Sequence, residues 1–323
     1  MNYIIVTHTD MDGVGAAAIY IYYHGIKPKQ IIFTEPYLLD KIFNKISRVR
    51  GVDKIVFSDL GLNNNYIYLA VNTLRKLIDQ GITIEWYDHH VWEDEWIARF
   101  KGIGVKINID RSTCGAGVVA KYAPRRKEID EKYVDELVKG ICAGDLFKFD
   151  HWRGPWFLRL VRRRDDDKWR LYVLEKLVNG NGWCKEFTEK VVERLEQELN
   201  GYNLLKESLI IKEMNGIKIA VAPQIEFIEN SFSAAYIIGR FGVDIVAITS
   251  RDGKISLRSL EYNIRDLALK LGGGGHPRAA GFKLKIPLSI KLKQLIDKKT
   301  LLNYVLEILV DAIEKSGGLN RIQ

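Results

Sequence analysis

The N-terminal part of the chain alternates short apolar runs with longer stretches of helical periodicity. Strands are predicted at 3–7, 55–57 and 82–87, because these runs are β-branched or aromatic and too short for helices. Between them, the pattern predicts helices over 16–23 and 66–80. Such alternation is typical of a parallel sheet covered by helices, in which ligands bind beyond the carboxyl ends of the strands. Acidic or histidine residues directly follow each of these strands, so we expect a functional site at that edge.

The pattern changes after residue 146 and again near residue 204. The stretch 147–203 has helical periodicity without a clear strand and is rich in basic and aromatic residues. A second α/β pattern follows, with strands predicted at 217–221, 243–250 and 255–258, a hairpin turn at 251–254, and helices at 263–271 and 301–315. We therefore expect two α/β lobes, 1–150 and 206–323, joined by a helical basic linker over 151–205.

The composition suits a globular protein that buries a core, since 47% of its 323 residues are hydrophobic and 28% are charged. Apolar runs stay well below the ~20 residues that a membrane-spanning helix needs. The start, MNYIIVTHTD, lacks the basic region of a signal peptide. The sequence therefore predicts a cytoplasmic protein without a membrane partner.

Charge and cysteine content narrow the expected partners. The formal net charge of +8 favours polyanions, although many basic proteins bind no nucleic acid. The cysteines Cys114, Cys142 and Cys184 are few, widely spaced and odd in number. That spacing predicts neither a disulfide framework nor a thiolate zinc site.

Carboxylates and imidazoles gather in four short segments at 8–13, 58–61, 88–90 and 142–145. One Asp after a strand is usually a helix cap or a turn residue. Four such segments together favour a shared metal site, because mixed oxygen and imidazole ligands suit Mn²⁺, with Mg²⁺ or a related ion as substitutes. Two ions about 3.5–4 Å apart can activate water and stabilise both oxygens of an in-line displacement at phosphorus.

The ordered segments HTDMDG, SDLG, YDHH and AGD resemble the motifs of the DHH phosphoesterase superfamily. Transferred residue by residue, the resemblance implies one ion held by His8, Asp10 and Asp59. It implies a second ion whose ligands are Asp12, His89, Asp145 and again Asp59, as a bridge. It also assigns catalytic roles to His90, facing the scissile phosphate, to Asp88, orienting a histidine, and to Asp59.

Four consecutive glycines at 272–275 let backbone N–H groups approach a ligand closely, and His276 and Arg278 follow them. A flexible loop after a helix end is the alternative. The run resembles the GGGH motif of the DHHA1 domain, which binds the nucleotide part of the substrate. Ser256-Leu257-Arg258-Ser259 resembles the substrate-binding strand of that family, and Arg can contact a phosphate with two hydrogen bonds. The predicted substrate-binding residues are Arg258, Ser259, Gly274, Gly275, His276 and Arg278.

The linker holds six aromatic and six arginine residues between positions 149 and 172. Aromatic stacking beside cations is how proteins hold single strands without reading their sequence. A helix with an apolar face and a solvated basic face is the alternative, and the sequence leaves both open.

The resemblance implies an α/β fold, in which a parallel-sheet DHH catalytic domain and a smaller α/β DHHA1 domain are joined by the helical linker. It implies a two-metal phosphoesterase that hydrolyses short oligonucleotides (nanoRNA) and small nucleotides such as 3′-phosphoadenosine 5′-phosphate, as in the oligoribonuclease branch. The alternatives are a RecJ-like single-strand exonuclease, a cyclic-dinucleotide phosphodiesterase and a scaffold subunit of a replication complex. The expected partners are short single-stranded RNA or DNA, or nucleotides, and two divalent cations, Mn²⁺ ahead of Mg²⁺ or Co²⁺. The oligomeric state stays open, a homodimer included.

Overall fold

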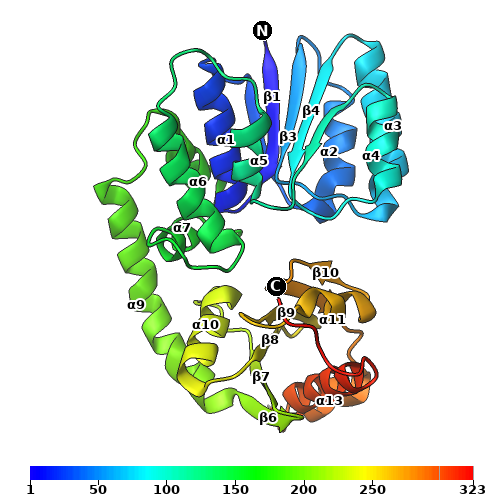
Figure 1. The fold of residues 1–323 in the computed structure, drawn as a ribbon, viewed down its shortest axis with the longest axis vertical. Helices are drawn as coiled ribbons and strands as arrows, with labels where there is room; N and C mark the ends of the chain where they lie inside the picture. Colours follow the sequence, from blue (N-terminus) through cyan, green and yellow to red (C-terminus); the bar gives the residue numbers. More distant parts are fainter. Residues whose placement is uncertain (298, 323) are drawn as a thin grey trace. The chain divides into compact units, whose positions relative to one another are not determined.

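The computed structural model describes residues 1–297 and 299–322. The chain forms two compact units, Met1–Thr188 and Glu189–Gln323. Each unit has its own sheet with helices packed on it, which confirms the predicted α/β fold with two lobes (Figure 1). Helix α9, Lys185–Ser208, leads from the first unit into the second. The functional boundaries expected at 150/151 and 205/206 stay a prediction.

The first unit is built on a five-stranded parallel sheet with the order β2-β1-β3-β4-β5. Its strands are β1 (Tyr3–His8), β2 (Gln30–Thr34), β3 (Lys54–Ser58), β4 (Thr83–Asp88) and β5 (Lys106–Ile109). The three strands predicted from the sequence, β1, β3 and β4, are the buried central ones. The edge strands β2 and β5 were not predicted. Polar and apolar residues alternate along the short β5, whereas β2 contains the apolar run 31–33, which is as long as the one predicted at 55–57.

The strand order places a topological switch point between β1 and β3. From β1 the chain passes to β2 on one side, and from β2 it returns to β3 on the other side of β1. The two crossovers therefore diverge and leave a crevice at the carboxyl ends of β1 and β3, where open α/β sheets bind ligands. His8 is the last residue of β1, and Asp59 directly follows β3.

Helices cover both faces of this sheet (Figure 1). One face packs against α2 (Leu39–Ile46), α3 (Asn64–Asp79) and α4 (Asp94–Gly102), and the other against α1 (Met11–His24) and α5 (Gly115–Tyr122). Because side chains alternate along a strand, Ile4 and Val6 join the core under α2–α4, whereas Tyr3 packs against Tyr20 of α1.

Helix α1 begins earlier than the predicted start at residue 16. Asp10 caps it by accepting a hydrogen bond from the Gly13 amide, and the helix ends at Gly25, in the left-handed conformation with φ 68°. Gly13 weakens the helical pattern but is required by packing, because a Cβ there would lie 2.4 Å from the His8 carbonyl oxygen. The close approach of α1 to β1 therefore explains the missed first turn.

A buried polar network lies between the sheet and α1. Lys54 Nζ is 2.8 Å from Glu85 Oε1, and the hydroxyls of Tyr20 and Tyr87 donate to Glu85 Oε2 at 2.8 and 3.1 Å. Burial would raise the pKa of Glu85, but the hydrogen bond and charge of Lys54 lower it below its ordinary value. The Glu85 carboxylate is thus ionised and paired with Lys54 inside the core.

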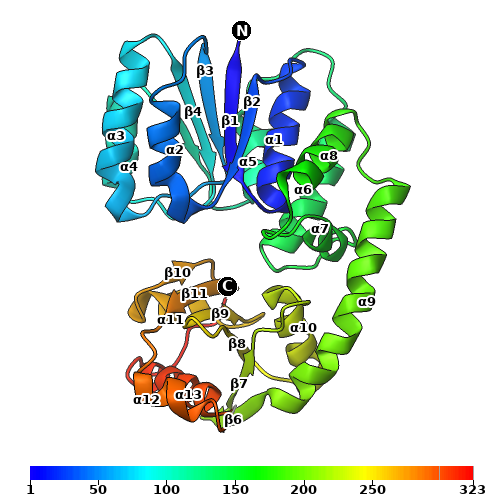
Figure 2. The same cartoon turned by 180° about the vertical axis from the view of Figure 1, so that it is seen from behind.

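The segment 131–188 adds a helical layer beside α1 (Figure 2). It consists of α6 (Glu131–Asp145), α7 (Gly154–Leu160), α8 (Asp167–Val178) and the first turn of α9. This agrees with the predicted helical character of the stretch that begins at residue 147.

The second unit has a six-stranded sheet with the order β10-β11-β9-β8-β7-β6, in which only β7 and β8 are parallel. Its strands are β6 (Ile210–Met214), β7 (Ile217–Pro223), β8 (Ile245–Thr249), β9 (Lys254–Arg258), β10 (Gly274–Gly275) and β11 (Ala279–Lys283). Its further helices are α10 (Asn230–Phe241), α11 (Ile264–Lys270), α12 (Leu288–Lys293) and α13 (Thr300–Glu314). The predicted strands at 217–221, 243–250 and 255–258 are confirmed as β7, β8 and β9. Across the described residues, every helix is too short or too polar to span a lipid bilayer.

Candidate metal centre and substrate residues

The first candidate ligand group lies at the switch point. His8 Nδ1 is 2.8 Å from Asp10 Oδ2 and 3.4 Å from Asp59 Oδ2. One ligand atom from each of these residues lies within 4.8 Å of the others. Asp10 is oriented by its role as the cap of α1, so the start of that helix and the ends of two strands fix the group.

The second group joins Asp12 of α1, His89 after β4 and Asp145 at the end of α6. His89 Nε2 is 3.6 Å from Asp12 Oδ2 and 3.7 Å from Asp145 Oδ2, and all three ligand atoms lie within 4.8 Å of one another. These residues are far apart in the sequence, so the packing of α6 beside α1 is what completes the group.

Asp59 lies between the two groups. Its Oδ2 faces His8 at 3.4 Å, and its Oδ1 faces His89 Nε2 at 3.2 Å. The residue adopts a positive φ of 55°, which is uncommon for a residue other than glycine and stores backbone strain. Gly115 makes room for it, because a Cβ at that position would lie 2.6 Å from the Asp59 Cβ.

The polar atoms of the two ligand groups are suited to binding divalent cations. Asp59 Oδ2 and Asp145 Oδ2 are buried and accept no hydrogen bond within the described residues. Burial and the nearby Asp59 and Asp145 carboxylates raise the pKa of Asp12 well above its ordinary value. Burial likewise raises the pKa of Asp145 to about 6. Crowded carboxylates with imidazoles beside them are a donor set for hard or borderline cations such as Mn²⁺.

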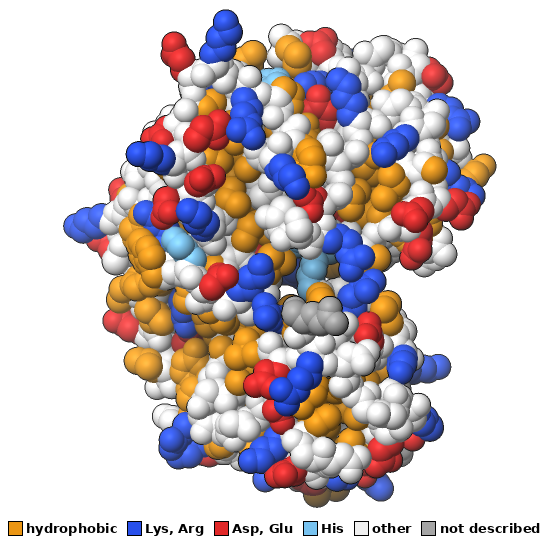
Figure 3. Space-filling view, viewed as in Figure 1, with side chains coloured by type: hydrophobic (Ala, Val, Ile, Leu, Met, Phe, Trp, Pro, Cys, Tyr) orange, Lys and Arg blue, Asp and Glu red, His pale blue; other side chains and the backbone are white. Residues whose placement is uncertain are grey.

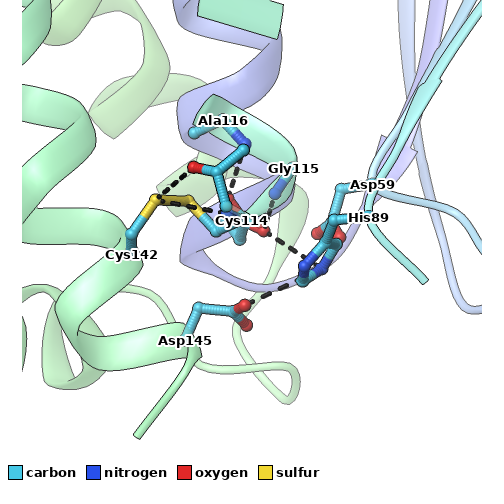
Figure 4. The surroundings of a disulfide bond; sticks show 9 residues. Asp59, His89, Cys114, Gly115, Ala116, Cys142 and Asp145 are labelled. Carbon is cyan, nitrogen blue, oxygen red and sulfur yellow. Dashed lines mark hydrogen bonds and ion pairs between the residues drawn. A yellow bond between two sulfur atoms is a disulfide. The ribbon is translucent and has the colours of Figure 1, made fainter. Parts of the chain in front are cut away.

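The N-terminus of α5, where Figure 4 labels Gly115 and Ala116, holds the carboxylate of Asp12. The Gly115 amide donates to Asp12 Oδ2 at 2.6 Å, and the Ala116 amide donates to Asp12 Oδ1 at 2.7 Å. Both amides lie in the first turn of α5 and have no acceptor within that helix, so their hydrogen bonds fix the orientation of the Asp12 carboxylate.

A disulfide joins Cys114, the residue before this helix, to Cys142 of α6, three residues before Asp145 (Figure 4). The expectation that the cysteine spacing indicates no disulfide is therefore wrong. The two Cα atoms lie 5.1 Å apart although 28 positions separate them in the chain. Only the packing of α5 against α6 brings them together. Cys184 is a free, partly buried thiol.

Asp88 and His90 form a pair beside the metal groups. His90 Nδ1 is 2.8 Å from Asp88 Oδ1, and Trp92 Nε1 donates to Asp88 Oδ2 at 2.7 Å. Burial would raise the pKa of Asp88, but the charge and hydrogen bond of His90 lower it to about 2. Gly61 leaves space for His90, since a Cβ there would lie 2.9 Å from the His90 Cβ. That Asp88 orients His90 for catalysis stays a prediction.

The sequence reasoning missed Glu35, which follows β2. Glu35 Oε2 is 3.4 Å from His8 Nε2, and Thr9 Oγ1 donates to Glu35 Oε1. Burial would raise the pKa of Glu35, but the hydrogen bond and charge of His8 lower it. A carboxylate on the far nitrogen of a ligating histidine orients the ring. The sequence signal for Glu35 is a carboxylate directly after a strand, but that strand, β2, was not predicted.

The basic segment around residues 149–172 does not form one solvated face. Arg159, Arg162 and Arg170 are buried, whereas Arg163 and Arg164 are exposed. Several aromatic rings pack against one another, as Trp169 does on Tyr172 with ring centroids 5.4 Å apart. On the face of the molecule in Figure 3, Lys and Arg side chains are interspersed with Asp and Glu. The role of the segment in binding single strands stays a prediction.

The predicted substrate residues of the second unit lie on β9 and β10, which flank β11 on either side, and in the turns that follow these two strands. Arg258 ends β9, where it pairs with Ala279 of β11, and Gly275 of β10 pairs with Ala280. Arg258 Nε and Nη2 donate to Ser231 Oγ at 3.2 and 3.1 Å.

The remaining residues of this set adopt well-defined positions. The His276 amide donates to the Ala279 carbonyl at 2.8 Å, and the half-buried Arg278 donates from Nε to the Leu260 carbonyl at 3.3 Å. Ser259 is fully buried and donates to the Asp244 carbonyl at 2.7 Å, so its side chain lies away from the surface. Gly274 and Gly275 form β10, which pairs with β11, and Gly275 has φ 131°. A Cβ on Gly275 would lie 2.6 Å from the Ala279 carbonyl oxygen, so the glycine permits this close backbone approach.

Two family models match the chain, the DHH family N-terminal domain over residues 2–144 and the DHHA1 domain over residues 217–303. The chain belongs to the DHH superfamily. These matches confirm the family predicted from the motifs, whereas the oligoribonuclease branch stays a prediction. Members of the DHH superfamily are metal-dependent phosphoesterases or exonucleases, and the chain is an enzyme of this kind.

Solved structures with a similar fold include the exonuclease RecJ bound to manganese, with 14% identity, a TM-score of 0.55 and coverage of 96% of this chain and 90% of the other. RecJ from Thermus thermophilus in complex with Mn²⁺ has 14% identity and a TM-score of 0.54, and the match covers 96% of this chain but only 52% of that RecJ chain. The pGpG-specific phosphodiesterase PggH from Vibrio cholerae has 16% identity, a TM-score of 0.51 and coverage of 93% and 99%. At these identities the likeness concerns the fold. No curated protein sequence matches the chain.

Proposed function

We propose that this DHH protein hydrolyses phosphodiester or phosphomonoester bonds in short oligonucleotides and small nucleotides, with two divalent cations bound at the switch point. The observation that supports this most is the position of Asp59, whose two oxygens face the two separate ligand groups. Mn²⁺ is the proposed ion, in keeping with the mixed donor set and with the manganese named for RecJ.

The chain's own residues would divide the work between holding cations and placing the substrate. His8, Asp10 and Asp59 would hold one cation, and Asp12, Asp59, His89 and Asp145 the other. When bound, such cations lower the pKa of water and offset the negative charge that develops on phosphate.

His90 is the proposed contact to the scissile phosphate. Its Nδ1 is engaged by the carboxylate of Asp88, which favours a proton on that nitrogen. The imidazole plane is thereby fixed, and Nε2 is the nitrogen that would accept a proton or, once protonated, donate to a phosphate oxygen. Trp92 on the second oxygen of Asp88 keeps this carboxylate from rotating.

The second unit would bind the nucleotide portion of the substrate. The guanidinium of Arg258, placed by Ser231, would bind a phosphate, and the amides around Gly274 and Gly275 lie where side chains cannot block a ligand. His276 and Arg278 follow directly on the same hairpin. A dinucleotide or 3′-phosphoadenosine 5′-phosphate has both a scissile phosphate and a second group for such contacts.

The substrate class is tested by hydrolysis of end-labelled RNA and DNA oligomers of graded length with Mn²⁺, beside 3′-phosphoadenosine 5′-phosphate, pGpG and a cyclic dinucleotide. We expect the fastest turnover on the shortest RNAs. Faster degradation of long single strands would favour a RecJ-like exonuclease. Hydrolysis restricted to cyclic dinucleotides would assign the enzyme to that class. Bound Mn²⁺ without hydrolysis of any substrate would contradict the proposal and favour a scaffold. Light scattering of the same sample determines the oligomeric state, which the sequence leaves open.

A further inference from the structure

An arginine from the linker reaches the first ligand group. Arg163 Nη2 lies 3.4 Å from Asp10 Oδ2, and 65% of the Arg163 side chain is exposed. The guanidinium is therefore at the solvent-facing side of the group. Its distance to Asp10 is longer than the 2.7–2.9 Å of a close charge-assisted hydrogen bond, whereas His8 is 2.8 Å from the same oxygen.

The loop that presents Arg163 is held in place by a buried arginine. Arg170 donates from Nε to the Thr9 carbonyl at 2.7 Å and from Nη2 to the Arg163 carbonyl at 2.6 Å. Thr9 separates His8 from Asp10, so one guanidinium ties the backbone of the ligand loop to the backbone of Arg163. The side chain of Arg170 is only 4% exposed, which makes it a fixed part of the core.

Further hydrogen bonds close this loop on itself. Asp165 Oδ2 accepts from the Arg162 amide at 2.8 Å, and Trp169 Nε1 donates to the Leu160 carbonyl at 2.7 Å. Arg170 Nη1 also donates to Asp167 Oδ1 at 2.9 Å. A side chain that is exposed on so constrained a backbone is pre-organised rather than freely moving.

Charge explains what the guanidinium can do in this position. An arginine stays protonated and cannot ligate a metal. Its polar contact among the described residues is with Asp10, whose oxygens are candidate cation ligands, so several of its five N–H donors stay available. A planar cation beside a metal group matches a phosphate, which it can bind with two parallel hydrogen bonds.

We propose that Arg163 binds a phosphate oxygen of the substrate beside the first ligand group, and that Arg170 is the positioning residue that holds Arg163 there. This deepens the proposed phosphoesterase function and rests on it. The proposal also distinguishes two arginines that are adjacent in the sequence, because Arg162 is buried while Arg163 faces the carboxylates.

The test of Arg163 compares Arg163→Ala, Arg163→Lys and a control, Lys168→Ala, which removes one exposed positive charge from α8. We expect Arg163→Ala to lower kcat/KM on a short RNA by about 100-fold, the scale of losing one preorganised donor. Arg163→Lys should lose less, and Lys168→Ala should stay near wild type. Guanidinium ion at a non-denaturing concentration should partly restore Arg163→Ala.

Two readouts do not depend on turnover. Inorganic phosphate should bind the Mn²⁺-loaded Arg163→Ala protein more weakly than wild type in calorimetry, and Mn²⁺ content should be unchanged or higher. Lost Mn²⁺ would make Arg163 a support of the metal group and overturn its substrate role. Unchanged phosphate affinity with unchanged kcat/KM would overturn it as well. An inactive wild type would instead contradict the proposed function, while the phosphate measurement would still decide the role of Arg163.

The role of Arg170 is tested by a double-mutant cycle with Arg170→Lys, which keeps the charge but not the geometry of three contacts. If Arg170 acts through Arg163, adding Arg170→Lys to Arg163→Ala causes no further loss of kcat/KM. Independent, multiplying losses would overturn the positioning role. Circular dichroism and thermal melting of each variant confirm that the compared proteins are folded.

Discussion

His89 Nε2 lies 3.2 Å from Asp59 Oδ1, while the other oxygen of that carboxylate faces His8. One side chain therefore connects two groups that arise from different strands. It does so from a backbone held at φ 55°, packed closely against Gly115.

Asp59→Ala is expected to remove more metal and activity than any other single change in the cluster. Because both groups lose a ligand, Mn²⁺ content should fall at both sites and kcat should drop more than the 10–100-fold typical of outer contacts. Elemental analysis and single-turnover kinetics measure this, with the exposed Asp79→Ala on α3 as the control. A variant with two bound Mn²⁺ and near-normal turnover would show that Asp59 is not a bridge.

Metal binding should stabilise the protein more as the pH rises between about 5 and 8. Burial raises the pKa of Asp145 to about 6. In the metal-free protein, ionisation of Asp145 therefore destabilises the folded state relative to the unfolded chain, and this loss of stability is complete above that pH. Burial would lower the pKa values of His8 and His89, but Asp10 and Asp59 raise them well above 6.5. The stability these histidines contribute is full below pH 6.5 and is lost as pH rises through the higher folded values.

Both effects have the same sign, so the melting temperature of the metal-free protein should fall across this pH range. Calorimetry with chelator and with Mn²⁺ measures the difference, since bound cations replace the protons. An Mn²⁺-dependent stabilisation that is equal at both ends of the range would contradict this account.

Reduction of the Cys114–Cys142 bond should destabilise the first unit. A loop with a separation of 28 residues corresponds to about 3.5 kcal/mol in the chain-entropy treatment. Cys142→Ser should show the same loss without reductant, and Cys184→Ser should show none. The amides that hold Asp12 begin next to Cys114, so weaker Mn²⁺ binding should accompany the loss. Three titratable thiols in the native protein would disprove the bond.

Arg258→Ala should raise KM on dinucleotides while leaving kcat and Mn²⁺ content nearly unchanged. A group that binds ground state and transition state equally affects KM alone. The effect should be smaller on longer oligomers, which have other contacts. The exposed Arg240→Ala on α10 is the matched control. Lost metal, or an unaltered KM on the shortest substrates, would refute the role.

The sequence alone was sufficient to identify the edge of the sheet at which the candidate metal ligands gather, for a simple geometric reason. The strands at Tyr3–His8, Lys54–Ser58 and Thr83–Asp88 are central, buried and apolar, and a parallel sheet brings their carboxyl ends to one side. Residues that follow such strands must then meet, and the DHH motifs follow them. In the second unit, the glycine run was recognisable because only glycine permits the approach of β10 to β11.

Tertiary structure alone decided which side chains from an edge strand, or from distant parts of the chain, contact one another. Glu35 follows an edge strand that was not predicted, Cys142 meets Cys114 only because α5 packs on α6, and the Glu85 carboxylate is paired with Lys54 inside the core. Arg162, Arg163 and Arg164 are identical in type, and their local sequence offers no distinction. The hydrogen bonds of Arg170 determine which of them faces Asp10, because burial and orientation are properties of the packed backbone and not of the residue type.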